Sequence, residues 1–202
     1  VAAAGGNRRC AKYADKRMRK GIRRAGRVKI LGKFCRRAKV LYKTGVKPQQ
    51  QYGLHVCGAS TSQRTSARRA AALCLGSAGW RPCLASVLEL KGGDSFDPEI
   101  GLIVQQIALW LDLWWTMTSK QKHEVTEAWR PKRDALQKMA ERERWRSVTG
   151  PMAATLVTLL ELGWHPIQPN HWLTQDLSQA AMRLTLGCKA SILEAIRSSA
   201  KH

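Results

Sequence analysis

Acidic residues are scarce at the start of the chain. Asp15 is the only one among the first fifty residues, beside 8 lysines and 9 arginines, so this quarter carries a net charge of +16. The remaining 152 residues hold 18 basic and 13 acidic groups, a net charge of only +5. Positive charge segregated in this way points to a polyanionic partner, most often nucleic acid and less often an anionic membrane surface.

Long hydrophobic runs are also missing. The longest apolar stretch, 100–115, is interrupted by Gln105, Gln106 and Asp112 and is too short to span a bilayer. The chain opens at Val1 rather than at a methionine, so we expect a fragment of a longer reading frame or a processed product. It lacks the basic and apolar regions of a secretory signal, so we expect an intracellular protein. Because 44% of the 202 residues are apolar, wholesale disorder is excluded, and one domain or two small ones are expected.

Motifs that hold metals, phosphates or nucleophiles are lacking as well. The six cysteines form no C-x-x-C pair, and most are expected to be small, reduced core residues. Glycine-rich phosphate loops and nucleophile elbows are absent, so we expect no enzyme activity, no cofactor, no metal and no small-molecule substrate. The acidic group Asp94, Asp97 and Glu99 is expected to cap the helix that follows it rather than to bind magnesium.

Apolar residues at helical spacing predict an all-α fold, an irregular multi-helix assembly that starts with basic amphipathic helices. The first helix is expected over 8–27, weakened by Gly21 and Gly26. Its apolar seam consists of Ala11, Ala14, Met18, Ile22 and Ala25. A second helix is expected to end at Gly45. Its apolar face consists of Leu31, Phe34, Cys35, Ala38, Leu41 and Tyr42.

The body of the chain predicts further helices. One is expected over 60–75, with caps offered at 60–62 and closed by Gly76, and the strongest covers 100–115. A long charged helix is expected over 119–146, starting at or kinked by Pro131.

The remaining segments are shorter. An apolar helix is expected over 152–162, a turn over 163–170, and one or two weaker helices after that. Residues 49–57 fit a short helix or a strand equally well. These expectations divide the chain into a basic helical region, 1–76, a loop-rich connector, 77–98, and a tryptophan-rich helical region, 99–202.

The eight tryptophans are expected to pack in the core rather than to stack on nucleic-acid bases. Trp110, Trp114 and Trp115 share the apolar face of one predicted helix, and Trp80, Trp164 and Trp172 lie in nearly neutral segments. None lies among the basic first fifty residues.

The basic helices are the one feature that indicates a binding function. Their cations far outnumber the single acid nearby, and neutralising phosphates would release condensed counterions. We therefore expect RNA or DNA to be bound by its backbone, without sequence preference. An acidic protein or membrane surface, or simply a solvated charged face, remains the alternative. The candidate contacts are Arg8, Arg9, Lys12, Lys16, Arg19, Lys20, Arg23, Arg24, Arg27, Lys33, Arg36, Arg37, Lys43, Lys47, Arg68 and Arg69.

Residues 41–53, LYKTGVKPQQQYG, resemble the thumb region that follows the catalytic palm in reverse transcriptases of non-LTR retrotransposons. There, a helix ending in Leu-Tyr leads to a proline and then to a Tyr-Gly pair. Residues 68–76 are similar to the basic and apolar helix that comes next, and 28–32 loosely match a short leucine-glycine motif. Residues 145–172 resemble the C-terminal extension of one divergent group of these enzymes.

The resemblance lacks the catalytic centre. Reverse transcriptases hold two metal ions with palm carboxylates, typically adjacent aspartates in a Tyr-x-Asp-Asp turn. Here Tyr13, Ala14 and Asp15 are followed by Lys16, and no palm precedes them. The resemblance therefore implies a non-catalytic fragment that grips a primer–template duplex through the basic residues of 8–47. It implies a nuclear location if the chain belongs to a mobile element. The alternative is a free-standing helical interaction or structural protein whose basic arm docks an acidic protein or an RNA-rich assembly.

Overall fold

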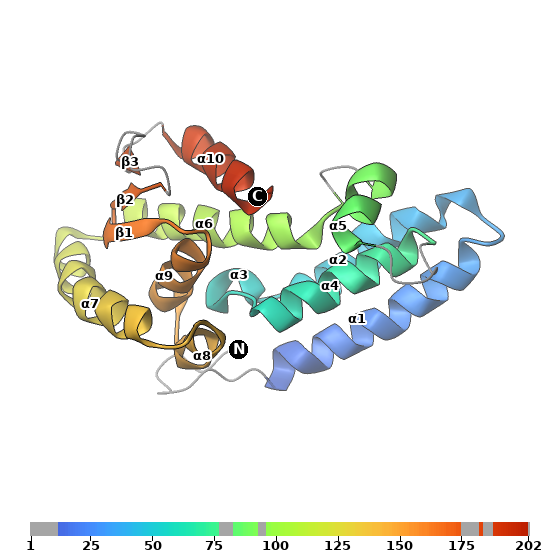
Figure 1. The fold of residues 1–202 in the computed structure, drawn as a ribbon, viewed down its shortest axis with the longest axis horizontal. Coiled ribbons are helices and arrows are strands. Elements are labelled where there is room, and N and C mark those ends of the chain that lie inside the picture. The colour runs from blue at the N-terminus through green and yellow to red at the C-terminus, as the bar shows by residue number, and fades with distance from the viewer. Residues whose placement is uncertain (1–11, 77–82, 93–95, 175–181, 184–187, 202) are drawn as a thin grey trace. The chain divides into compact units, whose positions relative to one another are not determined.

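The computed structural model describes residues 12–76, 83–92, 96–174, 182–183 and 188–201 (Figure 1). Helices account for most of these residues, so the predicted all-α class is confirmed. Contacts group the described residues into two compact units. We call 12–54 with 59–102 the basic unit, and 55–58 with 103–201 the tryptophan unit.

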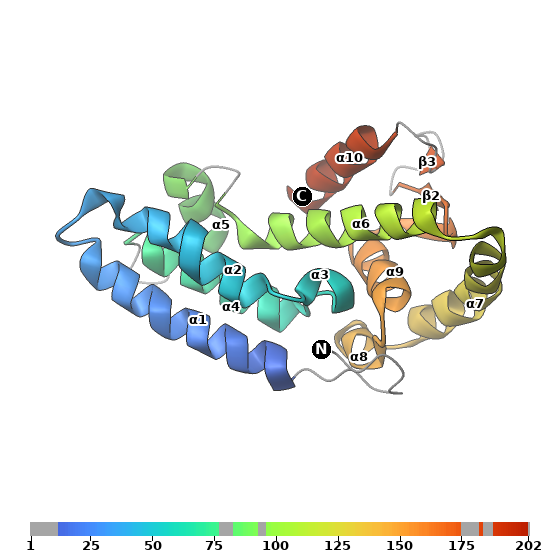
Figure 2. The ribbon, with the colours of Figure 1, turned by 180° about the vertical axis from the view of Figure 1, so that it is seen from behind.

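Helix α1 (Lys12–Leu31) is amphipathic, as predicted, although its buried seam differs by one position. Ala14, Met18 and Ala25 are buried as expected, whereas Ile22 is exposed and Gly21 is buried in its place. The seam packs on alanines of α4 (Thr61–Cys74), and α1 and α4 lie side by side in both views (Figures 1 and 2). Residues 8–11, predicted to start the helix, lie outside the described residues.

Gly21 allows a second close contact, with α2 (Lys47–Gln51). A Cβ atom at position 21 would stand 2.3 Å from Cγ of Gln50, whose side chain is only 1% exposed. Such a distance is far inside van der Waals contact, so only glycine lets the two helices approach in this way. The glycine that weakens the isolated helix is therefore required for its packing.

The predicted second helix is not continuous. The chain turns at 32–35 and then forms the short 3₁₀-helix η1 (Arg36–Lys39) and the π-helix η2 (Tyr42–Val46). Only Ala38 and Tyr42 of the predicted apolar face are buried. The prediction was wrong for Leu31, Phe34, Cys35 and Leu41, which are exposed. The assumed α-helical period of 3.6 residues fails because neither 3₁₀ nor π winding follows it.

Gly45 does not end a helix. The backbone stays helical from η2 into α2, and Pro48 lies in the first turn of α2. A four-residue helix, α3 (Leu54–Cys57), follows, so the ambiguous segment 49–57 is helical rather than a strand.

Helix α4 begins and ends as predicted. The backbone N–H of Ser60 donates to Oε1 of Gln63 over 3.1 Å at its start, as in a capping box. At its end Gly76 has φ +74°, the left-handed conformation that glycine adopts without strain. The described part of the segment predicted as a loop-rich connector is partly helical, with α5 (Leu84–Val87) and the π-helix η3 (Leu88–Gly92).

Helix α6 (Pro98–Thr116) confirms the strongest sequence prediction. Its large apolar residues are buried or partly buried at the expected spacing, and the tryptophan unit begins at Ile103 within it. Oδ1 of Asp97 accepts the N–H of Glu99 over 2.8 Å, the capping role predicted for this acidic group. Asp94 lies outside the described residues.

The long charged helix is divided. Helix α7 (Ser119–Lys138) contains Pro131, and the extended backbone of Met139 then separates it from α8 (Glu141–Arg144) and the 3₁₀-helix η4 (Trp145–Ser147). The prediction of one helix to Arg146 was wrong, because charged residues of high helix propensity continue past the break. The apolar helix α9 (Pro151–Glu161) follows Gly150, as predicted.

Three short strands form an antiparallel sheet in the order β1 (His165–Gln168), β2 (His171–Leu173) and β3 (Met182–Arg183). Segment 163–170, predicted as a turn, contains β1 and only the tip of this hairpin. Strands of two to four residues are too short to show a period-2 pattern. Helix α10 (Lys189–Lys201) closes the described part of the chain.

Tryptophans fill the core of the tryptophan unit. Trp110, Trp114, Trp129, Trp145, Trp164 and Trp172 are each at most 8% exposed, and Trp115 is partly buried. Two indoles bind the hairpin, because Nε1 of Trp110 donates to the Pro169 carbonyl and Nε1 of Trp129 to the Pro166 carbonyl, each over 3.1 Å. The predicted core role is therefore confirmed for these residues, while Trp80 lies outside the described residues.

The prediction that most cysteines are core residues was wrong. Cys74 is buried, but Cys35 and Cys83 are exposed, and Cys57 and Cys188 are half-buried. Cys10 lies outside the described residues. The spacing of cysteines does not by itself predict their burial. Cys35 was assigned to the apolar face of a helix that is not continuous, so its predicted burial failed with that helix.

Candidate nucleic-acid interface

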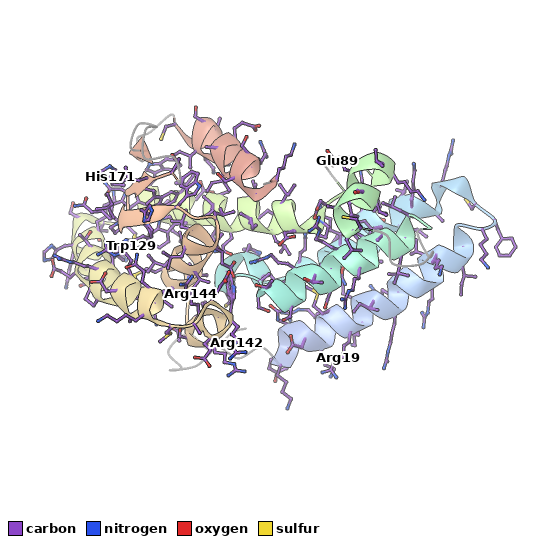
Figure 3. All side chains as sticks on the ribbon, in the orientation of Figure 1. Arg19, Glu89, Trp129, Arg142, Arg144 and His171 are labelled. Atoms are coloured by element: carbon purple, nitrogen blue, oxygen red, sulfur yellow. The ribbon has the colours of Figure 1, made fainter. Side chains whose placement is uncertain are left out.

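Helix α1 exposes seven of the predicted contacts, which we call the α1 cationic face. At about 100° per residue they lie on the side of the helix away from its buried seam. The rise of about 1.5 Å per residue spreads them along about 22 Å, several phosphate spacings of a nucleic-acid strand. Arg19 is labelled in Figure 3. The α1 cationic face comprises Lys12, Lys16, Arg19, Lys20, Arg23, Arg24 and Arg27, all exposed.

The single acid of this segment does not neutralise the α1 cationic face. Asp15 accepts a hydrogen bond from Nε2 of Gln63 on α4, with 2.8 Å between Nε2 and Oδ1. Its carboxylate is thus held toward the neighbouring helix. Among the described residues, no carboxylate forms an ion pair with a member of the α1 cationic face. The face therefore presents a nearly uniform positive potential to solvent.

The predicted contacts after α1 have mixed surroundings. Lys33 and Arg37 are exposed near the turn that follows α1. Lys43 lies 5.8 Å from the ring centre of Phe96, a cation–π distance. Lys47 is half-buried, and burial, with a contribution from Lys43, lowers its pKa. Arg8 and Arg9, and the side chain of Arg36, lie outside what the structure describes.

Arg68 belongs to an internal ion cluster rather than to an open surface. Its Nη2 lies 3.1 Å from Oδ2 of Asp97 and its Nη1 lies 2.9 Å from Oε2 of Glu99. Arg64 completes the cluster, with Nε 2.9 Å from Oε1 of Glu99 and Nη1 donating to the Ala59 carbonyl over 2.8 Å. These arginines tie α4 to the start of α6, so Arg68 is engaged structurally, whereas Arg69 is exposed.

Burial raises the pKa of Asp97, while the N–H of Glu99 and the Arg68 guanidinium oppose the rise. Sequence reasoning did not single out Arg64. The available signal was its spacing of four residues from Arg68, which places both guanidinium groups on one side of α4.

Among the described residues, no three His, Cys, Asp or Glu side chains gather where they could hold a metal ion. Asp15, the only counterpart of a polymerase aspartate near Tyr13, lies inside α1 and binds Gln63. No helix in the described part of the chain has both the length and the apolar character needed to cross a membrane.

Comparison of the chain with protein-family models, with curated proteins and with solved structures finds no match in any of the three. The resemblance of residues 41–53 and 145–172 to retrotransposon reverse transcriptases therefore stays a prediction. The α1 cationic face is the feature from which a function is argued below.

Proposed function

We propose that this protein binds the phosphate backbone of RNA or DNA duplexes, without sequence preference, through the α1 cationic face. The observation that carries the proposal is the exposure of seven cations on one side of α1, while Asp15 is held by Gln63. Regularly spaced cations match phosphates by charge and carry no information about bases. In this proposal the chain grips nucleic acid and performs no catalytic step.

The buried tryptophans are consistent with this division of roles. Six of them are at most 8% exposed, so their faces are covered by protein rather than open to stacking on bases. Binding would then depend on charge, and sequence preference would be weak. The resemblance of residues 41–53 to a polymerase thumb, a region that grips duplex nucleic acid, supports the same proposal.

Salt-dependent binding to a duplex tests the proposal. Arg19, Arg23 and Arg27 are replaced together by glutamine in the full chain, and fluorescence anisotropy is measured with a labelled 20-base-pair duplex. The logarithm of the association constant falls linearly with the logarithm of the salt concentration. If each arginine neutralises one phosphate, the magnitude of this negative slope should decrease by about 0.9 for each arginine removed. Two duplexes of different sequence should bind alike.

A matched control removes the same charge elsewhere. Lys120, Lys138 and Arg142 are exposed on the tryptophan unit and are replaced together by glutamine. Arg144 is avoided because its Nε donates to the Leu136 carbonyl over 3.0 Å; Arg142 and Arg144 are labelled in Figure 3. An equal loss in both triple variants, or an affinity that does not change with salt, would reject the α1 cationic face as the binding surface.

A second candidate function is docking of an acidic protein by the same region. The observation that favours it is apolar exposure beside the cations, since Ile30 is 59% and Phe34 is 85% exposed. Exposed apolar groups rimmed by charge are typical of protein interfaces. Nuclease treatment separates the two functions, because a protein complex survives the loss of nucleic acid whereas backbone binding does not.

A further inference from the structure

A hollow of about 330 Å³ lies at one end of the basic unit, apart from the α1 cationic face. Four lysines line it, each from a different segment of the chain: Lys29 on α1, Lys33 in the turn that follows, Lys39 on η1 and Lys91 on η3. Cys74 and Leu75, at the end of α4, form another part of its wall. Residues up to 62 positions apart in the sequence thus bring four lysines to one concave surface.

The described lining contains no carboxylate. Glu89 of η3, labelled in Figure 3, is exposed and is not among the residues that line the hollow. The thiol of Cys74 adds no negative charge, because burial raises its pKa to about 12. Cations that share a concave surface focus a positive potential, which a compact anion relieves better than scattered counterions do.

The volume limits the ligand to a small one. Pockets for small molecules begin at about 300 Å³, so the hollow accommodates a few phosphate groups rather than a nucleic-acid helix. Lysine ammonium groups act as compact point charges that suit phosphate oxygens without demanding a planar partner. Three of the lysines, Lys33, Lys39 and Lys91, are exposed, so a ligand can reach them from solvent.

We propose that this four-lysine hollow binds a compact, multiply charged phosphate group, either a free polyphosphate or the 5′-triphosphate end of an RNA strand. The site goes beyond the proposed backbone binding and does not depend on it, because the residues differ from the α1 cationic face. The competing explanation is that these lysines only complement the carbonyl ends of α1 and α4. That explanation predicts an effect on stability and no saturable phosphate binding.

Calorimetric titration of the full chain with inorganic tripolyphosphate at physiological salt tests the site. We expect saturable binding of one ligand, weakened about tenfold or more in the variant K33Q/K39Q, because charge-assisted contacts are lost. The variant K33R/K39R, which keeps both charges, should retain binding. The matched control K120Q/K138Q removes two exposed charges from α7, outside both the hollow and the α1 cationic face, and should stay within about twofold of the parent protein, since exposed charges outside the hollow are screened.

Two RNA arms identify the source of the phosphate. The same short RNA is compared with a 5′-triphosphate and with a 5′-hydroxyl end. Tighter binding of the triphosphate form that K33Q/K39Q abolishes assigns the hollow to RNA ends, whereas equal binding of both forms, with tripolyphosphate still bound, assigns it to free polyphosphate. Absence of saturable tripolyphosphate binding, or an equal loss in K120Q/K138Q, overturns the site and leaves the proposal for the α1 cationic face standing.

Discussion

The basic unit and the tryptophan unit differ in the size of the side chains that fill their cores, which are mostly small in the basic unit and mostly large in the tryptophan unit. Alanines such as Ala25, Ala67 and Ala70 are fully buried between α1 and α4, and Tyr42 and Phe96 stack nearby with ring centres 4.6 Å apart. The tryptophan unit instead packs indoles together, with Trp110 and Trp129 only 5.3 Å apart between ring centres. Small side chains let helices approach closely but remove little apolar surface from water.

This difference in core packing determines what supports the charged surface of the basic unit. The α1 cationic face belongs to the unit whose core has few large side chains. Its helices must therefore pack at short distances, because van der Waals attraction between small side chains stabilises the fold only when they are in close contact. The tryptophan unit carries little excess charge and has large side chains to bury. We infer that the charged surface depends on tight backbone approach, whereas the other unit depends on indole burial. The predictions below test that contrast, starting with the largest effect.

Replacing Trp129 by alanine should destabilise the tryptophan unit by about 3–5 kcal/mol, because a fully buried indole is lost and the cavity collapses only in part. The change also removes the donor to the Pro166 carbonyl, which fixes the hairpin to α7. Urea unfolding followed by far-UV circular dichroism measures the loss. Glu124→Ala, at an exposed position of the same helix, should stay within about 0.5 kcal/mol. If Trp129→Ala lowered the free energy of unfolding no more than Glu124→Ala does, the dependence of this unit on indole burial would be contradicted.

Two glycines of α1 should respond to alanine with opposite signs. Gly21→Ala should destabilise the basic unit by about 1–3 kcal/mol, because the new Cβ collides with the buried Gln50 side chain. Gly26→Ala should stabilise it by about 0.5–1 kcal/mol, because no atom lies within 4 Å of that Cβ and alanine favours the helix. Thermal unfolding of both variants measures the difference. Equal gains at the two positions would show that close approach at Gly21 is unimportant.

Thiol reactivity should give the smallest effect and report how well the basic unit covers its core. Hydrogen bonds from the backbone and side chain of Ser86 lower the pKa of the exposed Cys83 thiol, which increases its thiolate fraction at neutral pH. Burial raises the pKa of Cys74 to about 12, so its thiol stays protonated.

Iodoacetamide labelling with peptide mapping checks this order. Cys83 should react first and Cys74 last, and raising the pH from 6 to 8 should bring Cys83 to its plateau rate earlier than an ordinary thiol. In Gly21→Ala, Cys74 should become more reactive as the basic unit loosens. Labelling of Cys74 as fast as Cys83 in the parent protein would mean that the alanine-rich core opens readily.

Helices with large apolar residues were predictable from the sequence. Helix α6 repeats large apolar residues at helical spacing, namely Ile103, Ile107, Leu111 and Trp114. Because such large side chains are the ones a helix turns toward the core, the buried face of α6 could be predicted. In α1 the same reasoning placed Ile22 in the seam, because hydrophobicity favours isoleucine over glycine. The structure buries Gly21, since the partner helix approaches too closely for a larger residue, and this constraint comes from α2 and is not local.

The candidate site was predictable only in part for a similar reason. Exposure of Arg19 and Arg23 followed from the helical period of α1 alone. The engagement of Arg68 with Asp97 and Glu99 required α4 and α6 to meet, and the lysine hollow required η3 to return beside the end of α1. Long-range juxtapositions of this kind leave no local pattern, and neither do strands as short as β1 and β2.

The placement of the indoles has an optical consequence. Seven of the eight tryptophans lie in the tryptophan unit, and the eighth, Trp80, is outside the described residues. Intrinsic fluorescence excited at the indole band therefore monitors the tryptophan unit almost alone, and events on α1 would pass nearly unseen. Ligand titrations on the cationic half of the chain call for an added label, whereas the native emission serves as an internal gauge of whether the other half stays folded.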